Sequence, residues 1–375
     1  MGPLYLGLMS GTSLDGVDGV LVEFGSEAGA PALRVLAHAT RLFDPAQAQE
    51  LLSLNTQGGP NELHRAALAS NALARLYAQV VADVLAASGT DAARVTAIGA
   101  HGQTVRHRPG EFDGLGYTLQ LNAPAVLAEL TGINVVADFR TRDVAAGGQG
   151  APLVPAFHRA VFGRTGRCSA VLNLGGMANL TALRLNGEVG GFDCGPGNVL
   201  LDHWCQASTG QAFDRRGAWA ATGRVIPGLL AWFLTEPFFA LPVPKSTGRD
   251  LFGAAWLDAH LKQFADARAE DIQATLSELT AVVCARDVEG HAPRADELLV
   301  CGGGALNQDL MARLQRLLPH LAVQATDTRG LPAQQVEACA FAWLAKAFVD
   351  GSCGNLASVT GARGPRILGA LYPAG

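Results

Sequence analysis

Apolar residues of this chain fall into runs that are interrupted by glycine-rich turns, and two widely separated stretches share one pattern. In the first, an apolar run from Leu4 to Met9 meets a turn of small and acidic residues, and apolar alternation continues from Val17 to Phe24. In the second, Ala170–Leu174 precedes the turn Gly175–Asn179 and the run Leu180–Leu185. Alternation with a period of two predicts a strand, a tight turn and a second strand in both stretches. We therefore expect a remote internal duplication with a cleft between the halves.

Helical periodicity and short apolar runs predict how the rest of the chain is built. Helices are expected over Ala46–Leu54, Asn61–Ser88, Pro124–Leu130, Val199–Ala207, Glu270–Arg286 and Ala333–Val349. Further strands are expected over Ala32–Leu42, Val95–Gly99, Asn134–Ala137 and Glu297–Val300. The helix from Glu270 is predicted to be amphipathic, with acidic residues in its first turn. Helices that alternate with strands indicate the α/β fold class.

Composition narrows the class of protein. The chain has 375 residues, which is comfortable for two domains, and 49% of them are hydrophobic, 16% are charged and 45 are glycine. These values favour a turn-rich α/β enzyme over a disordered or fibrous chain. A formal charge of −5 argues against a nucleic-acid partner. The seven cysteines include no C-x-x-C pair, so we expect neither a disulfide framework nor a zinc site.

Membrane association is not expected. The start of the chain lacks the pattern of a signal peptide, and no apolar run reaches membrane-spanning length. The best candidate, Val336–Val349, contains Glu337 and Lys346 and is predicted to be a buried helix. Together with the unpaired cysteines, this predicts a cytoplasmic protein.

The first glycine-rich turn carries groups that suit a nucleotide. Its two glycines, Gly11 and Gly16, let the backbone approach a bound group. The same stretch contains two hydroxyl side chains, Thr12 and Ser13, and two carboxylates, Asp15 and Asp18. N–H donors and hydroxyls suit phosphate oxygens, and a carboxylate beside them suits Mg²⁺. An ordinary hairpin needs the same residue types for its conformation, so this turn alone leaves both interpretations open.

Three glycine-rich turns follow predicted strands, at Gly11–Gly16, Gly175–Gly176 and Gly302–Gly304. Strand ends in α/β sheets are where ligands collect, so the set favours a nucleotide-binding protein. The chain contains no G-x-x-x-x-G-K-[ST] loop, and no G-x-G-x-x-G follows the first strand. A nucleotide would therefore bind through another kind of loop.

Several charged residues at strand ends are candidates for chemistry. Asp193 precedes a Gly-Pro-Gly turn and a helix start, where it is either a general base or a capping residue. The start of that helix is expected to stabilise phosphate charge. Asp138 and Arg140 either bind a ligand or brace two loops as an ion pair. Glu337 lies on an apolar helix and needs a cleft or a partner unless it faces solvent.

Three other features attract simpler interpretations. Cys194 is predicted to be a packed thiol rather than a nucleophile, because no histidine stands beside it. His101 is expected to be a packed or hydrogen-bonded turn residue. The loop Lys245–Arg249 can contact phosphate, but a solvated or domain-bracing loop is the preferred interpretation.

Taken together, these residues resemble one known family. The stretch Leu8–Asp18 is similar to the N-terminal signature of the anhydro-N-acetylmuramic acid kinases. Further motifs similar to those of the family, in the family's order, are His101–Thr104, Ala137–Arg140, Gly148–Pro155, Asn173–Asn179, Phe192–Asn198, Lys245–Arg249, Cys301–Gly304 and Pro332–Ala342. They are spread over nearly the whole chain, and as a set they are specific to this family.

The resemblance implies a fold and a reaction. The fold is that of the acetate kinase, sugar kinase, Hsp70 and actin superfamily, with two ribonuclease-H-like lobes around a nucleotide cleft. We expect residues 1–135 and about 350–375 in the first lobe and residues 136–349 in the second. The family uses ATP, water and Mg²⁺ to convert 1,6-anhydro-N-acetylmuramic acid to N-acetylmuramic acid 6-phosphate, in the recycling of cell-wall amino sugar.

The resemblance also assigns roles to residues. Asp193 matches the family's catalytic base, which takes a proton from water as the anhydro bond opens and O6 accepts the γ-phosphoryl group. Residues expected to bind ATP are Gly11, Thr12, Ser13, Leu14, Asp15, Gly16, Val17, Asp18, Gly175, Gly176, Gly302, Gly303 and Gly304, with Asp15 next to the metal. Residues expected to contact the sugar are Gln103, Asp138, Arg140 and Glu337. One departure is visible, because the family commonly has Thr where Cys194 stands.

Two other functions remain open at this level. A related kinase would phosphorylate another sugar or a carboxylate, and turnover that does not need the anhydro bond would reveal it. A nucleotide-switched interaction protein of the same fold would assemble without turning over sugar. The sequence leaves the oligomeric state open, a homodimer included.

Overall fold

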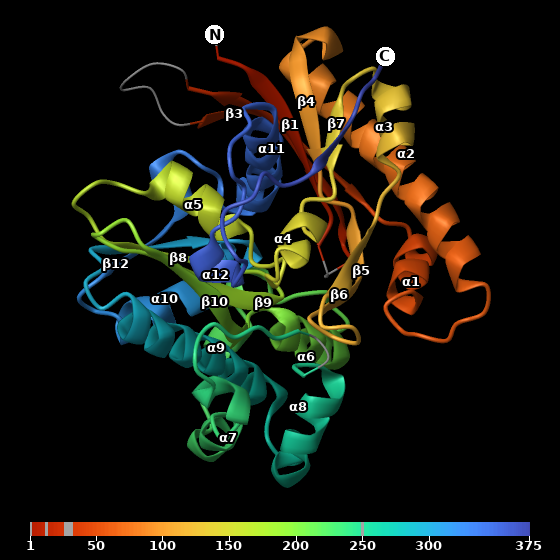
Figure 1. Cartoon of the computed structure of the whole chain (residues 1–375). Helices are drawn as coiled ribbons and strands as arrows, with labels where there is room; N and C mark the ends of the chain where they lie inside the picture. Colours follow the sequence, from red (N-terminus) through yellow and green to blue (C-terminus); the bar gives the residue numbers. More distant parts are fainter. Residues whose placement is uncertain (1, 12–13, 26–32, 249–250) are drawn as a thin grey trace. The chain divides into compact units, whose positions relative to one another are not determined.

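The computed structural model describes residues 2–11, 14–25, 33–248 and 251–375, and the chain forms two compact units. The first unit comprises Met1–Val161 and Gln335–Gly375, and the second comprises Phe162–Gln334 (Figure 1). These boundaries differ from the expected ones, because residues 136–161 and 335–349 belong to the first unit. The reason is that the helix at residues 336–349 packs against Gly7 and Gly99 of the first sheet, and Phe157 contacts this helix, with its ring centroid 6.3 Å from that of Trp343.

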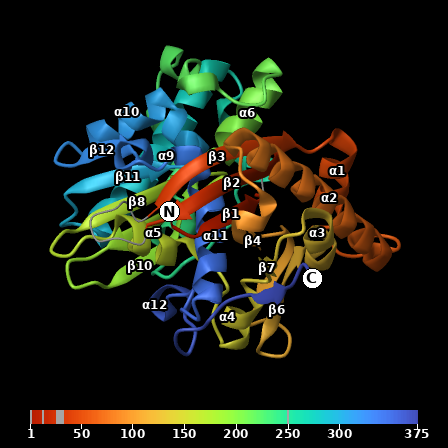
Figure 2. The same cartoon turned by 90° about the horizontal axis from the view of Figure 1, so that it is seen from above.

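The first unit is built on a six-stranded sheet. Its strands are β1 (Leu4–Met9), β2 (Gly16–Phe24), β3 (Leu33–Leu42), β4 (Val95–Ala100), β7 (Val135–Ala137) and β13 (Ala370–Tyr372). The order is β13-β7-β4-β1-β2-β3, and Figure 2 shows β3, β2, β1, β4 and β7 in this order across the sheet. Strands β1, β4 and β7 are parallel, so their carboxyl ends meet at one edge.

Helices and a hairpin complete the first unit. The helices are α1 (Pro45–Ser53), α2 (Glu62–Ser88), α3 (Pro124–Thr131), α4 (Thr141–Ala145), α5 (Val154–Phe162), α11 (Val336–Val349) and α12 (Ala357–Thr360). The hairpin consists of β5 (Gln103–Pro109) and β6 (Gly116–Leu121) and was not predicted from the sequence. It follows β4 directly and thus begins at the carboxyl edge of the sheet.

Helices α2 and α11 cover opposite faces of the first sheet. Leu6 and Leu8 of β1 pack in a core with Val80 of α2. Gly7 points the other way, and a Cβ there would lie 1.9 Å from the carbonyl oxygen of Ala338 in α11. Gly99 of β4 meets α11 equally closely. These glycines bring the helix backbone against the strands, which fixes α11 and its first turn next to the edge.

The second unit repeats this plan. Its strands are β8 (Ser169–Leu174), β9 (Met177–Leu183), β10 (Val189–Pro196), β11 (Glu297–Cys301) and β12 (Ala322–Ala325). The order is β10-β9-β8-β11-β12, with β8 antiparallel to β9 and parallel to β11. Its helices are α6 (Val199–Thr209), α7 (Pro227–Phe233), α8 (Ala254–Leu261), α9 (Ala269–His291) and α10 (Gln308–Leu317).

Both sheets therefore share one topology. In each, the first three strands form an antiparallel meander, and two later strands add in parallel beside the first strand. Numbered within each unit, the order of these five strands is 3-2-1-4-5 in both. The predicted α/β fold with two ribonuclease-H-like lobes is confirmed, and the two strand–turn–strand stretches are the first hairpins of the two repeats.

Helix α9 was wrongly predicted to be amphipathic. Fourteen of its residues are buried, including the polar Gln273, Thr275 and Ser277. It packs against β9 and β10 on one side and against α6, α7 and α10 on others, so no face is left for solvent along most of its length. A helix that is enclosed on all sides does not need a polar stripe.

Helix α11 is buried as expected, although it begins at Val336, after a short 3-10 turn, and not at Ala333. Among the described residues, no helix combines the length and the apolar character that crossing a bilayer would require.

Candidate functional site

The carboxyl edge of the second sheet holds one row of polar residues. Strand β10 runs in the same direction as β8 and β11, because both β8 and β10 are antiparallel to β9. The register places Cys301, Asn173, Asn179 and Asp193 opposite one another on consecutive strands. Directly opposed residues share a face of a sheet, so the two asparagines and Asp193 line the same face. On β8, β10 and β11 this row is followed by the glycine-rich segments Gly175–Gly176, Gly195–Gly197 and Gly302–Gly304.

Asp193 occupies a β-bulge at the end of β10. The register shifts after Asp193, which leaves Cys194 without a cross-strand partner. Such bulges re-aim side chains and are frequent beside active sites. Oδ2 of Asp193 accepts hydrogen bonds from the Ser246 hydroxyl at 2.8 Å and from the backbone N–H of Thr247 at 3.0 Å. Within the described part of the chain no donor reaches Oδ1, so this oxygen is available to a water or a hydroxyl.

The pKa of Asp193 is raised above the ordinary carboxyl value because burial disfavours the charged form. The hydrogen bonds from Thr247 and Ser246 oppose this shift and keep the carboxylate form accessible. A carboxylate with a raised pKa and one unengaged oxygen has the properties of a general base.

The loop at residues 245–247, expected to be solvated or to brace domains, is exposed at Ser246 but also packs on β10. Its backbone lies beside β10, and the N–H of Asp193 donates to the carbonyl of Lys245 at 3.0 Å. Lys245 itself is buried, and the next two residues hold the carboxylate. The sequence contained no signal for this contact beyond the motif itself, because 53 residues separate Ser246 from Asp193.

Cys194 points into the core on the other face of β10. It packs with buried residues of α9, and burial raises its pKa well above that of an ordinary thiol. A thiol that resists ionisation is a poor nucleophile. The structure thus agrees with the packed role expected from the sequence.

Gly175 and Gly176 form the turn between β8 and β9, which is shorter than predicted because β9 begins at Met177. Neither glycine has a positive φ, and a Cβ at Gly176 would meet nothing within 4 Å. Within the described residues, then, neither the backbone angle nor packing requires glycine at this position. Open space over a glycine turn suits the close approach of a ligand.

Three of the N–H groups that lead into α6, the helix expected to stabilise phosphate charge, are already engaged. The N–H groups of Gly197, Asn198 and Val199 all donate to carbonyls of the 175–176 turn, at 2.8 to 3.1 Å. A phosphate cannot use donors that are already engaged. These bonds instead tie the turn to the segment that follows Asp193.

Two glycines of the third turn have a packing reason. Gly302 has a φ of 79°, and a Cβ there would lie 2.5 Å from the Asn173 side-chain oxygen. A Cβ at Gly304 would lie 2.5 Å from Leu174. At Gly303 the nearest atom would be 3.7 Å away, so this glycine has no such requirement and leaves room for a ligand.

The edge of the first sheet carries the turn after β1. Thr12 and Ser13 lie outside the described residues. Leu14 has a φ of 60°, an uncommon value for a residue with a branched side chain, and such strain is frequent at functional sites. The Asp15 side chain is exposed, whereas Asp18 is hydrogen-bonded to Thr40 at 2.5 Å and lies 3.3 Å from His38.

Other residues proposed from the turn have local roles. Gly16 opens β2, and a Cβ there would lie 2.3 Å from the carbonyl oxygen of Arg41 on β3. Val17 is fully buried in the core under α2. Gln103 is also fully buried, and its amide donates to the Gly11 carbonyl at 3.1 Å. Its Oε1 is buried and has no hydrogen-bond partner among the described residues.

A guanidinium lies at the end of β7. Arg140 donates to the Nε2 of His101 at 3.0 Å and to the carbonyl of Gly150 at 2.8 Å. Burial lowers the pKa of Arg140 to about 10, and the charges of Glu337 and Asp143 oppose that shift. Glu337 is therefore close to Arg140 in electrostatic terms and is not a solvent-facing residue of α11. Arg140 and Glu337, two of the residues that the resemblance expects to contact the sugar, are thus close together within the first unit.

His101 has a defined tautomer in this cluster. Arginine only donates, so Nε2 must accept, and the proton resides on Nδ1, which faces the Ser10 carbonyl at 3.2 Å. Burial lowers the pKa of His101 well below its usual value, and the charge of Arg140 adds to this effect. His101 thus connects the β1 turn to Arg140. Asp138, which stands two residues before Arg140, is exposed and has a φ of 60°.

The described residues offer partial ligands for Mg²⁺. Within them, no group of three or more histidine, cysteine or acidic side chains forms a closed metal site. The Asp15 carboxylate is exposed, and no described donor engages it. Mg²⁺ in nucleotide sites is commonly held by one or two carboxylates together with phosphate oxygens and water. An exposed, unengaged carboxylate beside a turn that is expected to bind phosphate fits this arrangement.

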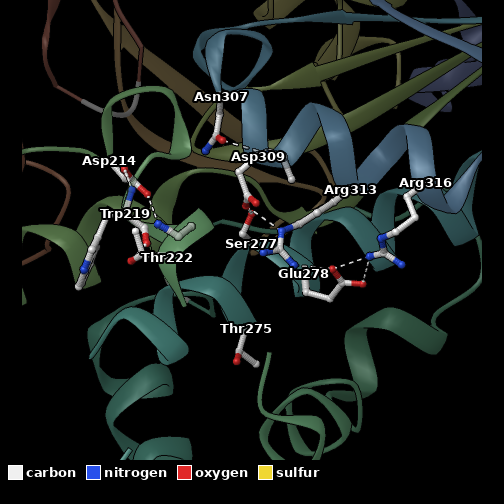
Figure 3. Close-up of polar contacts among 12 residues, drawn as sticks. Asp214, Trp219, Thr222, Thr275, Ser277, Glu278, Asn307, Asp309, Arg313 and Arg316 are labelled. Atoms are coloured by element: carbon white, nitrogen blue, oxygen red, sulfur yellow. Dashed lines mark hydrogen bonds and ion pairs between the residues drawn. The ribbon is translucent and has the colours of Figure 1, made fainter. Parts of the chain in front are cut away.

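A separate polar network braces α9 against α10 (Figure 3). Arg313 donates to Glu278 and to Asp309, each at 2.7 Å, and Arg316 also donates to Glu278. The Ser277 hydroxyl donates to Asp309 at 2.7 Å. The charged groups satisfy one another, so the network explains how Ser277 and Glu278 of α9 are buried with their hydrogen-bonding groups engaged.

The predicted site residues thus fall into two groups. One group lies at the edge of the first sheet, with Gln103 and Arg140 in its interior. The other lies at the edge of the second sheet, around Asp193. Sequence reasoning missed the contacts that His101 and Ser246 make in these groups, since each depends on a partner distant in the chain.

Comparison with known proteins gives a consistent result. A family model described as anhydro-N-acetylmuramic acid kinase matches residues 3–374. A relative of that name from Variovorax paradoxus is 61% identical over 100% of both chains. Another from Albidiferax ferrireducens is 57% identical, again over 100% of both.

Among solved structures, the activator of the 2-hydroxyisocaproyl-CoA dehydratase from Clostridium difficile is 13% identical. It aligns over 90% of this chain and 92% of that chain, with a TM-score of 0.47. A similarity of this size adds nothing to what the strand order already shows.

Proposed function

Since the chain belongs to the anhydro-N-acetylmuramic acid kinase family, we propose that Asp193 is the base of that family's reaction in this enzyme. The enzyme is a kinase that uses ATP and water to convert 1,6-anhydro-N-acetylmuramic acid to N-acetylmuramic acid 6-phosphate and ADP. The observation that carries the proposal is the pair of donors that holds Oδ2 of Asp193 and leaves Oδ1 unengaged.

The reaction needs one proton acceptor. Oδ1 of Asp193 accepts a proton from water while the water oxygen bonds to the anomeric carbon C1. The bond between C1 and O6 breaks, and its electron pair stays on O6. O6 then bonds to the γ-phosphorus of ATP as the bond to the β-phosphate oxygen breaks, which releases ADP. Catalysis consists mainly of positioning and charge stabilisation.

The glycine turns are proposed to bind ATP. The N–H groups of Gly175 and Gly176 and the open space above them suit phosphate oxygens, and Gly303 has similar room. In the first unit, Gly11 to Asp18 is proposed to contact the phosphates, with Asp15 beside Mg²⁺. When bound, Mg²⁺ neutralises phosphate charge during transfer. Asp18 is the weaker candidate because Thr40 already occupies one of its oxygens.

The sugar is proposed to bind at the edge of the first sheet. Arg140 retains N–H groups beyond those that His101 and Gly150 accept, and they suit oxygen acceptors of a sugar. Gln103 presents an unpartnered buried oxygen that suits a hydroxyl donor. Glu337 and Asp138 complete the set. The proposal places the reaction in the cytoplasm as part of cell-wall sugar recycling.

Isotope labelling tests the base assignment. The enzyme is incubated with 1,6-anhydro-N-acetylmuramic acid, ATP and Mg²⁺ in ¹⁸O-labelled water, with Asp193→Asn in parallel. We expect label at C1 of a 6-phosphorylated product from the wild type and no product from the variant. A folded variant that forms labelled product at the wild-type rate would overturn the role of Asp193.

A further inference from the structure

A buried ion pair lies behind the segment that holds Asp193. We propose that Lys245 and Asp287 are positioning residues, which anchor the loop that orients the base to helix α9. The proposal rests on the proposed role of Asp193 and adds to it two residues that touch no reacting group.

Lys245 is enclosed by the second unit. Its side chain is only 4% exposed, and Nζ lies 3.9 Å from Oδ2 of Asp287. The ammonium also donates to the carbonyl of Phe239 at 3.2 Å and lies 5.0 Å from the centre of the Phe238 ring. A buried ammonium needs an opposite charge, and Asp287 supplies it.

The same lysine is bonded to the base through its backbone. Its carbonyl accepts the N–H of Asp193, and the next two residues donate to Oδ2 of that carboxylate. Successive side chains of an extended segment point to opposite sides. Lys245 therefore reaches the α9 face of β10, while Ser246 reaches the face on which Asp193 lies. Because Ser246 and Thr247 directly follow Lys245, anchoring the lysine also fixes the two groups that donate to Asp193.

Asp287 also interacts with the strand that carries the base. Burial raises the pKa of Asp287, while the charge of Lys245, a hydrogen bond with the Cys194 thiol and the charge of His291 oppose that shift. Cys194 directly follows Asp193. One carboxylate on α9 thus meets both chain segments that determine the orientation of the base. Helix α9 is suited to this role because it is buried along most of its length.

A purely structural role is the main alternative, because any buried ion pair affects stability when one partner is removed. The two roles differ in what they change. A positioning role lowers kcat and alters the pH dependence of the base, whereas a structural role lowers the melting temperature alone.

The test uses Lys245→Met, Asp287→Asn and the double variant in the full-length enzyme. For the single variants we expect kcat to fall about 10- to 100-fold, the loss typical of small misplacements, with KM for both substrates within about twofold. The acid limb of the kcat profile should move to higher pH, because the donors that lower the pKa of Asp193 are no longer held in place. Lys245→Arg, which keeps the charge, should restore part of the rate.

The double variant guards against misfolding, since it leaves no unpaired charge in the core. We expect it to be the most stable of the three and still slow. A double variant that folds and retains the wild-type kcat and acid limb would overturn the proposal.

Glu278→Gln supplies a matched control. Glu278 is a buried carboxylate that is ion-paired with Arg313 and Arg316 (Figure 3). It lies nine residues before Asp287 on the same helix, which is about 14 Å along the axis. It should lower the melting temperature and leave kcat unchanged. If it lowers kcat as much as Asp287→Asn, the effect is general to α9 and the proposal fails. Failure of the proposed function is distinct, because the wild type itself would then form no product.

Discussion

The carboxyl edges of the two sheets differ in chemistry although their strand order is the same. At the first edge a guanidinium, Arg140, is half-buried against a neutral histidine, His101. At the second edge a carboxylate, Asp193, is held by two donors and has a raised pKa. Duplication supplied two equivalent scaffolds, and the residues near the strand ends gave one of them a cation and the other a carboxylate.

The glycines of the two units differ in the same way. In the first unit, Gly7 and Gly99 lie within strands and admit the backbone of α11. In the second unit, Gly302 and Gly304 lie beyond a strand and pack against the end of β8, while Gly176 faces open space. Glycine therefore serves packing at one place and leaves room for a ligand at another, and only the surroundings tell these cases apart.

Removing the base should have the largest effect. Asp193→Asn keeps the size of the side chain and its contact with Thr247 but cannot accept a proton. We expect kcat to fall by about 10²- to 10⁴-fold, with KM for ATP nearly unchanged. In the wild type, kcat should rise with pH through a limb above the ordinary carboxyl range, because burial raises the pKa of Asp193. A limb at or below the usual aspartate pKa would contradict this interpretation.

Removing the cation of the first edge should have the next largest effect. Arg140→Met deletes the donors proposed for the sugar and removes a positive charge near Glu337. We expect kcat/KM for the sugar to fall by about 100-fold, with little change in ATP binding measured by calorimetry. Arg142→Met, an exposed arginine of α4, is the matched control and should behave as wild type. Equal losses of sugar and ATP binding would argue against a sugar-specific role.

Altering the histidine of the first edge should have a moderate effect. His101→Gln offers Arg140 an oxygen acceptor on a more flexible side chain, so we expect about a tenfold rise in KM for the sugar.

The same variant changes the pH dependence of stability. The pKa of His101 is lower in the folded than in the unfolded chain, so the unfolded chain binds more protons and stability is lost as pH falls below about 6.5. The fall in melting temperature between pH 7.5 and pH 5 should be smaller in His101→Gln than in the wild type. An unchanged fall would mean that other groups dominate.

Replacing the thiol behind the base should have the smallest effect. Cys194→Thr restores the residue common in the family and gives Asp287 a stronger donor than a thiol. We expect kcat within about threefold of the wild type and a small rise in melting temperature, measured by calorimetry. Cys194→Ala is the companion variant, and a large loss of activity in it would revive a chemical role for the thiol.

Local pattern was sufficient for much of the fold. The apolar runs that end in glycine turns identified the hairpins β1–β2 and β8–β9, whereas the strand that carries Asp193 continues past the expected end to Pro196. Strand ends can be recognised this way because a buried strand and the turn after it are each encoded by neighbouring residues. The hairpin β5–β6 was missed because β5 is mostly polar, with Val105 as its buried apolar residue, although Tyr117, Leu119 and Leu121 alternate with polar residues along β6.

The sequence by itself determined the two strand–turn–strand repeats and the family to which the chain belongs, because both depend on short motifs in a set order. Only the tertiary structure decided that α9 is enclosed, that Glu337 lies near Arg140, and that Ser246 holds Asp193. Each of these depends on contacts between segments dozens to hundreds of residues apart. Periodicity reports which side of an element is apolar, but it carries no information about which distant residue will pack there.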